Sequence, residues 1–212
     1  MIKAVIFDLD GTIGDTMPLI IRSFRDAIEP YANRSVSDDE IIATFGRSEE
    51  GTIKMLVPEH YDESFAAFIR SYSKNHKQYS KPFDGITELL HELKSRNLKL
   101  GIVTGKGAVS YEITMREYGY ENIFDAADTG VPEGPRKPEG LRALLTQFGI
   151  EPHETVYIGD MDTDITASRE VGIPPISAAW ASTAETEKLK VMNPDATFES
   201  VAEFSDYLKS II

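Results

Sequence analysis

Strand and helix patterns alternate along much of this chain, and that alternation limits the possible folds more than any other feature of the sequence. Residues 3–9 (KAVIFDL) are almost continuously apolar, as a parallel strand covered on both faces would be. From residue 85 onward, amphipathic helix patterns alternate with short apolar runs such as residues 98–105 (LKLGIVTG) and 155–160 (TVYIGD). Because parallel strands need helical crossovers, this order predicts an α/β protein with a doubly wound parallel sheet.

Residues 16–80 interrupt that alternation with helical patterns only. Thr16 and Pro18 fit the N-cap and first turn of a helix, and Ser37 with Glu40 matches a capping box. The segment therefore predicts a helical insertion in the first crossover. We expect a cap domain over residues 16–80 and a catalytic core of residues 1–15 and 81–212.

Charge and composition narrow the classes of partner. The formal net charge of −13 argues against nucleic acid, because binding a phosphate backbone needs a basic face. A small phosphorylated ligand stays compatible, since a few local cations or a metal can reverse the field in one cleft. The chain has no cysteine, which excludes disulfides and thiolate metal sites. We find no signal peptide pattern and no apolar run near the roughly 20 residues of a membrane span, and therefore expect a cytoplasmic protein without a membrane partner.

Polar side chains follow three of the expected strands. Asp8 and Asp10 end the first strand, Thr104 ends residues 98–105, and Asp160 ends residues 155–160. Ligands bind to open parallel sheets at the carboxyl ends of the strands, where the strand order switches. These side chains are therefore expected to converge on one site. Gly11 and Gly14 fit a backbone that turns close to a ligand and then hinges into the cap.

Four short motifs resemble those of the haloacid dehalogenase superfamily of aspartate-nucleophile phosphohydrolases, in particular its phosphoglycolate phosphatase-like members. They are residues 8–16 (DLDGTIGDT), 103–106 (VTGK), 136–140 (RKPEG) and 159–164 (GDMDTD). The resemblance covers nearly the whole chain, and the helical insertion sits where one class of the family's caps sits. It implies a Rossmann-like core.

The resemblance also implies roles for the polar residues. Asp8 would be the nucleophile that forms an aspartyl phosphate, and Asp10 would be the general acid and base. Mg²⁺ would be held by Asp8, Asp160 and the main-chain carbonyl of Asp10, since it prefers oxygen ligands. The remaining roles fall to a phosphate-binding group and its support: Thr104 and Gly105 for the phosphoryl oxygens, Lys137 for the nucleophile and phosphate, and Asp164 for a metal-bound water or for Lys137.

Some residues keep competing interpretations. Arg136 competes with Lys137 for the cation role, because residues 136–140 lack the family's second proline and spacer. Arg47 is a candidate substrate contact in the cap. We expect Asp162 to be a solvated neighbour or helix cap, His76 to lie on a polar helix face, and Trp180 to belong to the core.

These features together predict a Mg²⁺-dependent phosphatase acting on a small phosphomonoester of the phosphoglycolate or sugar phosphate class. A phosphomutase would use the same Asp8 and Asp10. A dehalogenase is disfavoured because Asp10 is present, and an acidic phospho-acceptor signalling domain would need neither Asp10 nor a large cap. A non-catalytic phosphate-binding module is the remaining alternative. The sequence leaves the substrate and the oligomeric state open.

Overall fold

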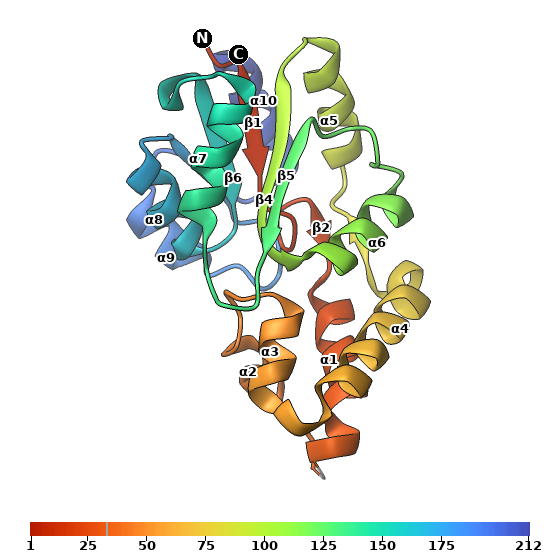
Figure 1. The fold of residues 1–212 in the computed structure, drawn as a ribbon. Helices are drawn as coiled ribbons and strands as arrows, with labels where there is room; N and C mark the ends of the chain where they lie inside the picture. The colour runs from red at the N-terminus through yellow and green to blue at the C-terminus, as the bar shows by residue number, and fades with distance from the viewer. Residues whose placement is uncertain (33) are drawn as a thin grey trace.

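A parallel six-stranded sheet forms the centre of the molecule (Figure 1). The structure is a computed structural model and describes residues 1–32 and 34–212. The spatial order of the strands is β5-β4-β1-β6-β7-β8, so the order reverses on either side of β1. The predicted doubly wound α/β architecture is thereby confirmed. The strands are β1 (Ala4–Phe7), β4 (Lys99–Gly107), β5 (Ala126–Gly130), β6 (Thr155–Gly159), β7 (Pro175–Ala178) and β8 (Thr197–Phe198).

Helices cover both faces of this sheet. Successive side chains of β1 point to opposite sides: Val5 and Phe7 belong to the apolar cluster with α5 and α10, whereas Ile6 belongs to the cluster with α7 and α8. This explains why residues 3–9 are apolar at nearly every position. The core helices are α5 (Ile86–Ser95), α6 (Ala108–Tyr118), α7 (Lys137–Phe148), η2 (Pro152–Glu154), α8 (Asp162–Val171), α9 (Thr186–Met192) and α10 (Val201–Ile211).

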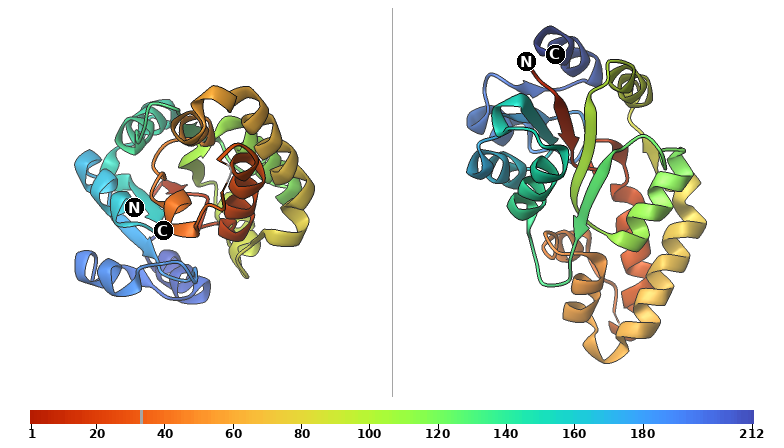
Figure 2. Two further views of the ribbon diagram at one scale, coloured as in Figure 1. Left: turned by 90° about the horizontal axis from the view of Figure 1, so that it is seen from below. Right: turned by 45° about the horizontal axis from the view of Figure 1, so that its top comes forward.

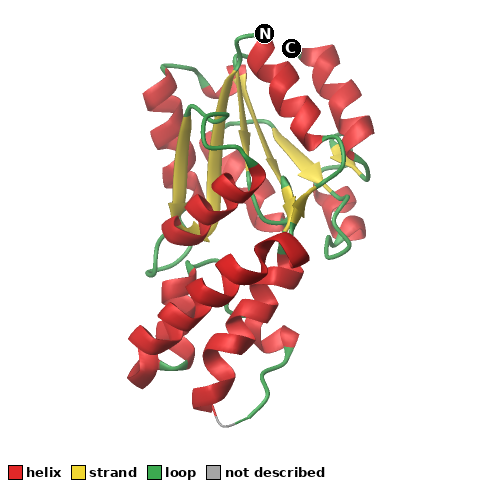
Figure 3. Ribbon diagram, turned by 90° about the vertical axis from the view of Figure 1, so that its right-hand side faces the viewer, coloured by secondary structure: helices red, strands yellow, loops and turns green. Residues whose placement is uncertain are grey.

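The segment between β1 and α5 forms a separate layer of helices below the sheet (Figures 1 and 3). It has its own apolar cluster, in which Phe24 of α1 packs on Phe68 of α4 with ring centroids 4.7 Å apart. The capping box of Ser37 and Glu40 is formed as predicted. Its helices are α1 (Met17–Ala32), α2 (Asp38–Ile42), α3 (Glu49–Leu56), η1 (Pro58–His60) and α4 (Tyr61–Tyr79).

Two short strands connect this layer to the core. β2 (Gly14–Asp15) and β3 (Lys81–Pro82) pair in antiparallel orientation, with Gly14 opposite Pro82. The chain thus enters and leaves the helical layer at one place. Figure 2 shows both chain ends at the opposite pole of the molecule. We propose that residues 16–80 form the cap domain and refer to them as the cap below.

Strand β4 differs from its sequence-based prediction. We expected it to end at Thr104 and Gly105 in a turn, but it continues to Gly107. Its pairing with β5 shifts register between Val103 and Gly107, so residues 104–106 lie opposite Thr129 alone. Such a bulge bends a strand and redirects its side chains. Thr104 therefore lies within the strand, and the next residues point in directions that a regular strand would not give them.

Candidate active site

Asp8 and Asp10 lie where β1 leaves the sheet between β4 and β6. Asp8 is buried, and its carboxylate accepts a hydrogen bond from the Leu9 N–H at 2.6 Å. The Asp10 carboxylate accepts one from the hydroxyl of Thr16 at 2.6 Å. Burial raises the pKa of Asp10, against the opposing effect of Lys106. Thr16, expected as a helix cap, thus contacts the proposed general acid from directly before α1.

Gly11 allows the turn after Asp10 to pass close to Asp160. Its φ of +78° lies in the left-handed region, which side chains disfavour. A Cβ at this position would also lie 2.2 Å from a carboxylate oxygen of Asp160. Gly14 fits the predicted hinge for another reason, because a Cβ there would meet the Tyr118 hydroxyl at 2.5 Å.

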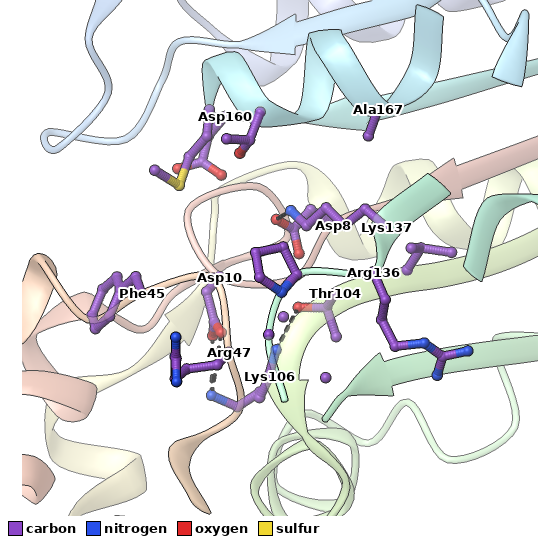
Figure 4. A pocket seen from close by; sticks show the side chains of 18 of the residues that line it. Asp8, Asp10, Phe45, Arg47, Thr104, Lys106, Arg136, Lys137, Asp160 and Ala167 are labelled. Carbon is purple, nitrogen blue, oxygen red and sulfur yellow. Dashed lines mark hydrogen bonds and ion pairs between the residues drawn. The ribbon is translucent and has the colours of Figure 1, made fainter. Parts of the chain in front are cut away.

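Lys137 reaches the carboxylates, and Arg136 does not. The Lys137 ammonium lies 2.5 Å from Asp8 Oδ2 and 2.5 Å from Asp164 Oδ1. Burial opposes its charge, but Asp164 and Asp8 outweigh burial and raise the pKa of Lys137. Arg136 extends away and pairs with Asp128 at 3.3 Å (Figure 4). The geometry therefore favours Lys137 for the cation role.

Three carboxylates gather around Lys137. Carboxylate oxygens of Asp8, Asp160 and Asp164 all lie within 4.8 Å of one another. Burial, followed by the charges of Asp8 and Asp164, raises the pKa of Asp160 well above its usual range. One ammonium cannot balance three buried carboxylates, so the cluster has an excess of negative charge. A hard divalent cation with oxygen ligands fits this donor set.

Asp164 is held in place by three donors. Besides Lys137, the Tyr157 hydroxyl donates to its Oδ1 at 3.0 Å, and the Met161 N–H donates to its Oδ2 at 3.0 Å. Burial raises the pKa of Asp164, and Lys137 opposes that effect. These contacts match the support role that the sequence suggested, since they fix Asp164 next to Lys137.

Thr104 and Gly105 face the same cavity, but the turn expected around them is not formed. The Thr104 hydroxyl accepts a hydrogen bond from the Lys106 N–H at 3.2 Å. The Gly107 N–H, one of the groups expected to face phosphate, donates to Glu49 at 2.6 Å. Within the bulge, the Gly105 carbonyl packs so closely on Gly130 that a Cβ there would lie 1.9 Å away.

The sequence interpretation missed Lys106 and Glu49. Lys106 is fully buried and lies 3.2 Å and 3.3 Å from the two carboxylate oxygens of Asp10. Glu49 comes from the cap, with an oxygen 3.6 Å from the Lys106 ammonium. A lysine so close to a buried strand end should have prompted a search for its carboxylate partner, because buried lysines are paired. The motif alone did not say which carboxylate.

A cavity of about 440 Å³ lies between the sheet and the cap. Asp8, Asp10, Thr104, Lys137 and Asp160 line its core side, as Figure 4 shows. Its cap side is mostly apolar. That side consists of Met17, Ile20, Phe24, Ile42 and Phe45, together with Arg47, the candidate substrate contact.

Three further expectations had different outcomes. His76 does not lie on a polar helix face: only 1% of its surface is exposed, and its Nε2 lies 3.3 Å from the Thr114 hydroxyl. The expectation was wrong because α4 packs this face on α6. Asp162 pairs with Lys188 at 2.8 Å, away from the carboxylate cluster. Trp180 is partly buried on the core and donates to the Thr12 carbonyl at 3.0 Å.

The sequence of the haloacid dehalogenase-like hydrolases, as a family, matches residues 5–178. This chain belongs to that family. The predicted superfamily is therefore confirmed, and with it the prediction of an enzyme, a phosphatase of the haloacid dehalogenase type. Among described residues, no helix combines the length and apolar character needed to cross a membrane.

Individual members resemble the chain over its full length. A putative pyrophosphatase PpaX of Clostridium perfringens is 29% identical over 213 residues, covering 100% of this chain and 99% of that protein. A pyrophosphatase PpaX of Oceanobacillus iheyensis is 28% identical, covering 95% and 94%. A predicted phosphoglycolate phosphatase from Haemophilus somnus aligns with a TM-score of 0.82 at 21% identity, covering 100% and 98%. CbbY from Rhodobacter sphaeroides, solved in complex with phosphate, aligns at 0.77 and 20% identity, covering 96% of both chains. At these identities, the solved structures show the shared fold alone.

Proposed function

We propose that this haloacid dehalogenase-type phosphatase is Mg²⁺-dependent and hydrolyses a small phosphomonoester through an aspartyl phosphate on Asp8. One observation carries the proposal most directly: Lys137 contacts Asp8 within a buried carboxylate cluster, and Asp10 faces the same cavity. A nucleophile, a cation and a separate proton donor are thus present around one position for a phosphoryl group.

The proposed reaction has two displacements. In the first, a carboxylate oxygen of Asp8 attacks phosphorus, the ester P–O bond breaks, and Asp10 protonates the leaving alkoxide. In the second, Asp10 takes a proton from water, whose oxygen attacks the phosphorus of the aspartyl phosphate. Inorganic phosphate leaves and Asp8 is regenerated. The raised pKa of Asp10 favours the protonated form that the first step needs.

Asp8, Asp160 and the main-chain carbonyl of Asp10 would hold Mg²⁺. When bound, the ion would neutralise phosphoryl oxygens and so reduce their repulsion of the Asp8 carboxylate. Lys137 would neutralise a further phosphoryl oxygen, and Thr104 with Gly105 would complete the phosphate-binding wall. Asp164 would keep Lys137 in position through their direct contact.

The cavity suits an organic leaving group. Its cap side combines apolar residues with Arg47, which supports a phosphomonoester of the phosphoglycolate or sugar phosphate class. Hydrolysis of inorganic pyrophosphate is a second candidate, because the relatives quoted above carry that name and because Arg47 and Arg136 could meet a second phosphoryl group. A phosphomutase remains a third.

Phosphate release from a panel of substrates, with Mg²⁺ or with a chelator, tests these candidates. The panel contains phosphoglycolate, several sugar phosphates and pyrophosphate, and each sugar phosphate is also assayed for interconversion of its isomers. We expect Mg²⁺-dependent release from a phosphomonoester. Release from pyrophosphate alone would support the second candidate, and isomer interconversion without release would support the third. Activity that the chelator leaves unchanged would contradict the metal assignment.

A further inference from the structure

We propose that Lys106 is a positioning residue for Asp10 and that Glu49 supplies a second anchor for Lys106 only while the cap lies on the core. The inference deepens the proposed function and rests on the acid and base role given there to Asp10. It adds a residue that orients Asp10 and a cap residue on which that orientation depends.

The first step of the argument is the contact between Lys106 and Asp10. The ammonium lies at nearly equal distances, 3.2 Å and 3.3 Å, from the two oxygens of the Asp10 carboxylate. A single donor placed between both oxygens restricts rotation of the carboxyl group. The Thr16 hydroxyl adds a second contact to Asp10 Oδ1. Together they fix the plane of Asp10 at the cavity (Figure 4).

The second step is the burial of Lys106. Its side chain is 0% exposed, and an ammonium removed from water is costly unless carboxylates compensate it. The β4 bulge over residues 104–106 directs this side chain toward Asp10. Because both residues belong to the core, their contact does not require the cap.

The third step is that the cap supplies the remaining contacts of Lys106. Glu49 lies 3.6 Å from its ammonium, and the Tyr72 ring lies 4.5 Å from it. Glu49 belongs to α3 and Tyr72 to α4, so both would leave if the cap moved away. An ammonium held from two sides keeps Asp10 oriented better than one held from the core alone.

The fourth step is that Glu49 is built into the junction between cap and core. Its carboxylate accepts hydrogen bonds from the Gly107 N–H at 2.6 Å and the Ser110 hydroxyl at 2.5 Å, both at the N-terminal end of α6. A Cβ on residue 107 would lie 2.5 Å from Glu49, so glycine leaves room for the contact. Next to Glu49, the Ser48 N–H donates to the Val131 carbonyl at 3.1 Å.

A chemical rescue tests the role of Lys106, and the absence of native cysteine makes it specific to one position. Lys106→Cys is alkylated in denaturant with 2-bromoethylamine, which restores an ammonium on a side chain of lysine length, or with iodoacetamide, which adds a neutral group. Both products are refolded and compared with wild type treated in the same way. Circular dichroism and the unfolding temperature establish that each has refolded.

The kinetic readout compares an alkyl phosphate with p-nitrophenyl phosphate. Because an alkoxide needs protonation far more than p-nitrophenolate, mispositioning Asp10 should lower kcat at least about thirtyfold for the alkyl phosphate and less than about threefold for the aryl one. Aminoethylation should restore kcat to within about fivefold of wild type, whereas the neutral adduct should not. Equal losses on both substrates, or equal activity of the two adducts, would overturn the positioning role. Lys94→Cys, at an exposed ion pair with Asp125, is the matched control.

Amide hydrogen exchange tests Glu49 without any turnover. In Glu49→Ala, the Gly107 amide should exchange at least about tenfold faster than in wild type, while amides in the middle of β1 keep their protection. Glu49→Gln should retain part of that protection but reproduce part of the kcat loss on the alkyl phosphate. Glu63→Ala, an exposed change on α4, is the control.

Unchanged exchange at Gly107 in Glu49→Ala would overturn the cap anchor, whatever the enzyme hydrolyses. If wild type released phosphate from no phosphomonoester, the proposed function would fail and the role of Lys106 with it. The exchange result would then still decide whether Glu49 holds the cap on α6. The two failures are therefore distinguishable.

Discussion

Asp8 combines burial with two fixed contacts, one to the Leu9 N–H and one to the Lys137 ammonium. An amide at this position keeps the shape of the side chain but cannot attack phosphorus as a carboxylate does. Asp8→Asn should therefore lower kcat by more than about 10³-fold while the protein stays folded. Steady-state phosphate release and thermal unfolding check this, with Asp162→Asn, outside the cluster, as control. A folded Asp8→Asn enzyme with wild-type kcat would contradict the assignment of the nucleophile.

Lys137 and Arg136 are adjacent, yet their contacts predict very different importance. Lys137→Ala removes the ammonium shared by Asp8 and Asp164, so we expect kcat/KM to fall by orders of magnitude. Arg136 pairs with Asp128 in a half-exposed position, and Arg136→Ala should change kcat/KM by less than about tenfold, or 1.4 kcal/mol. Measuring both variants on the best substrate decides the matter. A larger loss at Arg136 would show that the third motif had been aligned incorrectly.

At the residue scale, what could be predicted followed the strand ends. Asp8, Asp160 and Asp164 follow strands that lie side by side in a parallel sheet, so their proximity could be expected from the order of elements. The contact between Lys106 and Glu49 could not, because it joins the core to a separate helical segment. No periodicity within either segment says how the two pack on each other.

Helix α3 depends on one glycine where it meets the core. A Cβ at residue 51 would lie 2.4 Å from the Pro132 carbonyl oxygen, a backbone atom that cannot turn aside. Gly51→Ala should therefore prevent the cap from seating and lower kcat/KM at least about tenfold. Because alanine favours helix over glycine, the same change should leave stability unchanged or raise it by up to about 1 kcal/mol.

Kinetics and denaturant unfolding of Gly51→Ala, with the exposed change Met55→Ala on the same helix as control, test this pair of effects. Wild-type kcat/KM in Gly51→Ala would mean that α3 need not approach Pro132 during turnover. A large loss of stability would instead indicate that the alanine disturbs the cap itself.

Among the elements, long periodic helices and apolar strands were predictable, and short paired segments were not. The alternation after residue 85 indicated the parallel sheet because each pattern spans several residues. β4 was expected to end near Gly105, since glycine usually interrupts a strand, but pairing with β5 carries it on to Gly107. β2 and β3 have two residues each and form only because they meet each other.

For the molecule as a whole, the packing of α4 on α6 should make stability depend on pH through His76. Burial, then the charge of Lys106, lowers the pKa of His76 to about 4. The unfolded chain therefore binds this proton more readily than the folded protein, and stability falls as the pH drops from about 6.5 toward 4. We expect this histidine to contribute between about 1 and 3 kcal/mol of that loss.

Comparing the free energy of unfolding of wild type and His76→Gln at pH 7 and pH 5 isolates this contribution, because the carboxylates titrate in both proteins. The variant should lose less stability than wild type between the two pH values. The same loss in both would contradict a buried, neutral His76 between α4 and α6.

The pairing of β2 with β3 has a consequence for how such an enzyme diversifies. Because Gly14 and Pro82 lie opposite each other, the two ends of the intervening segment meet whatever its length or content. The sheet then experiences an insertion of any size as the same short loop, whose closure entropy grows only slowly with length. Natural selection can replace the whole intervening module, and with it the leaving group that fits the cavity, while the phosphoryl chemistry below is inherited unchanged.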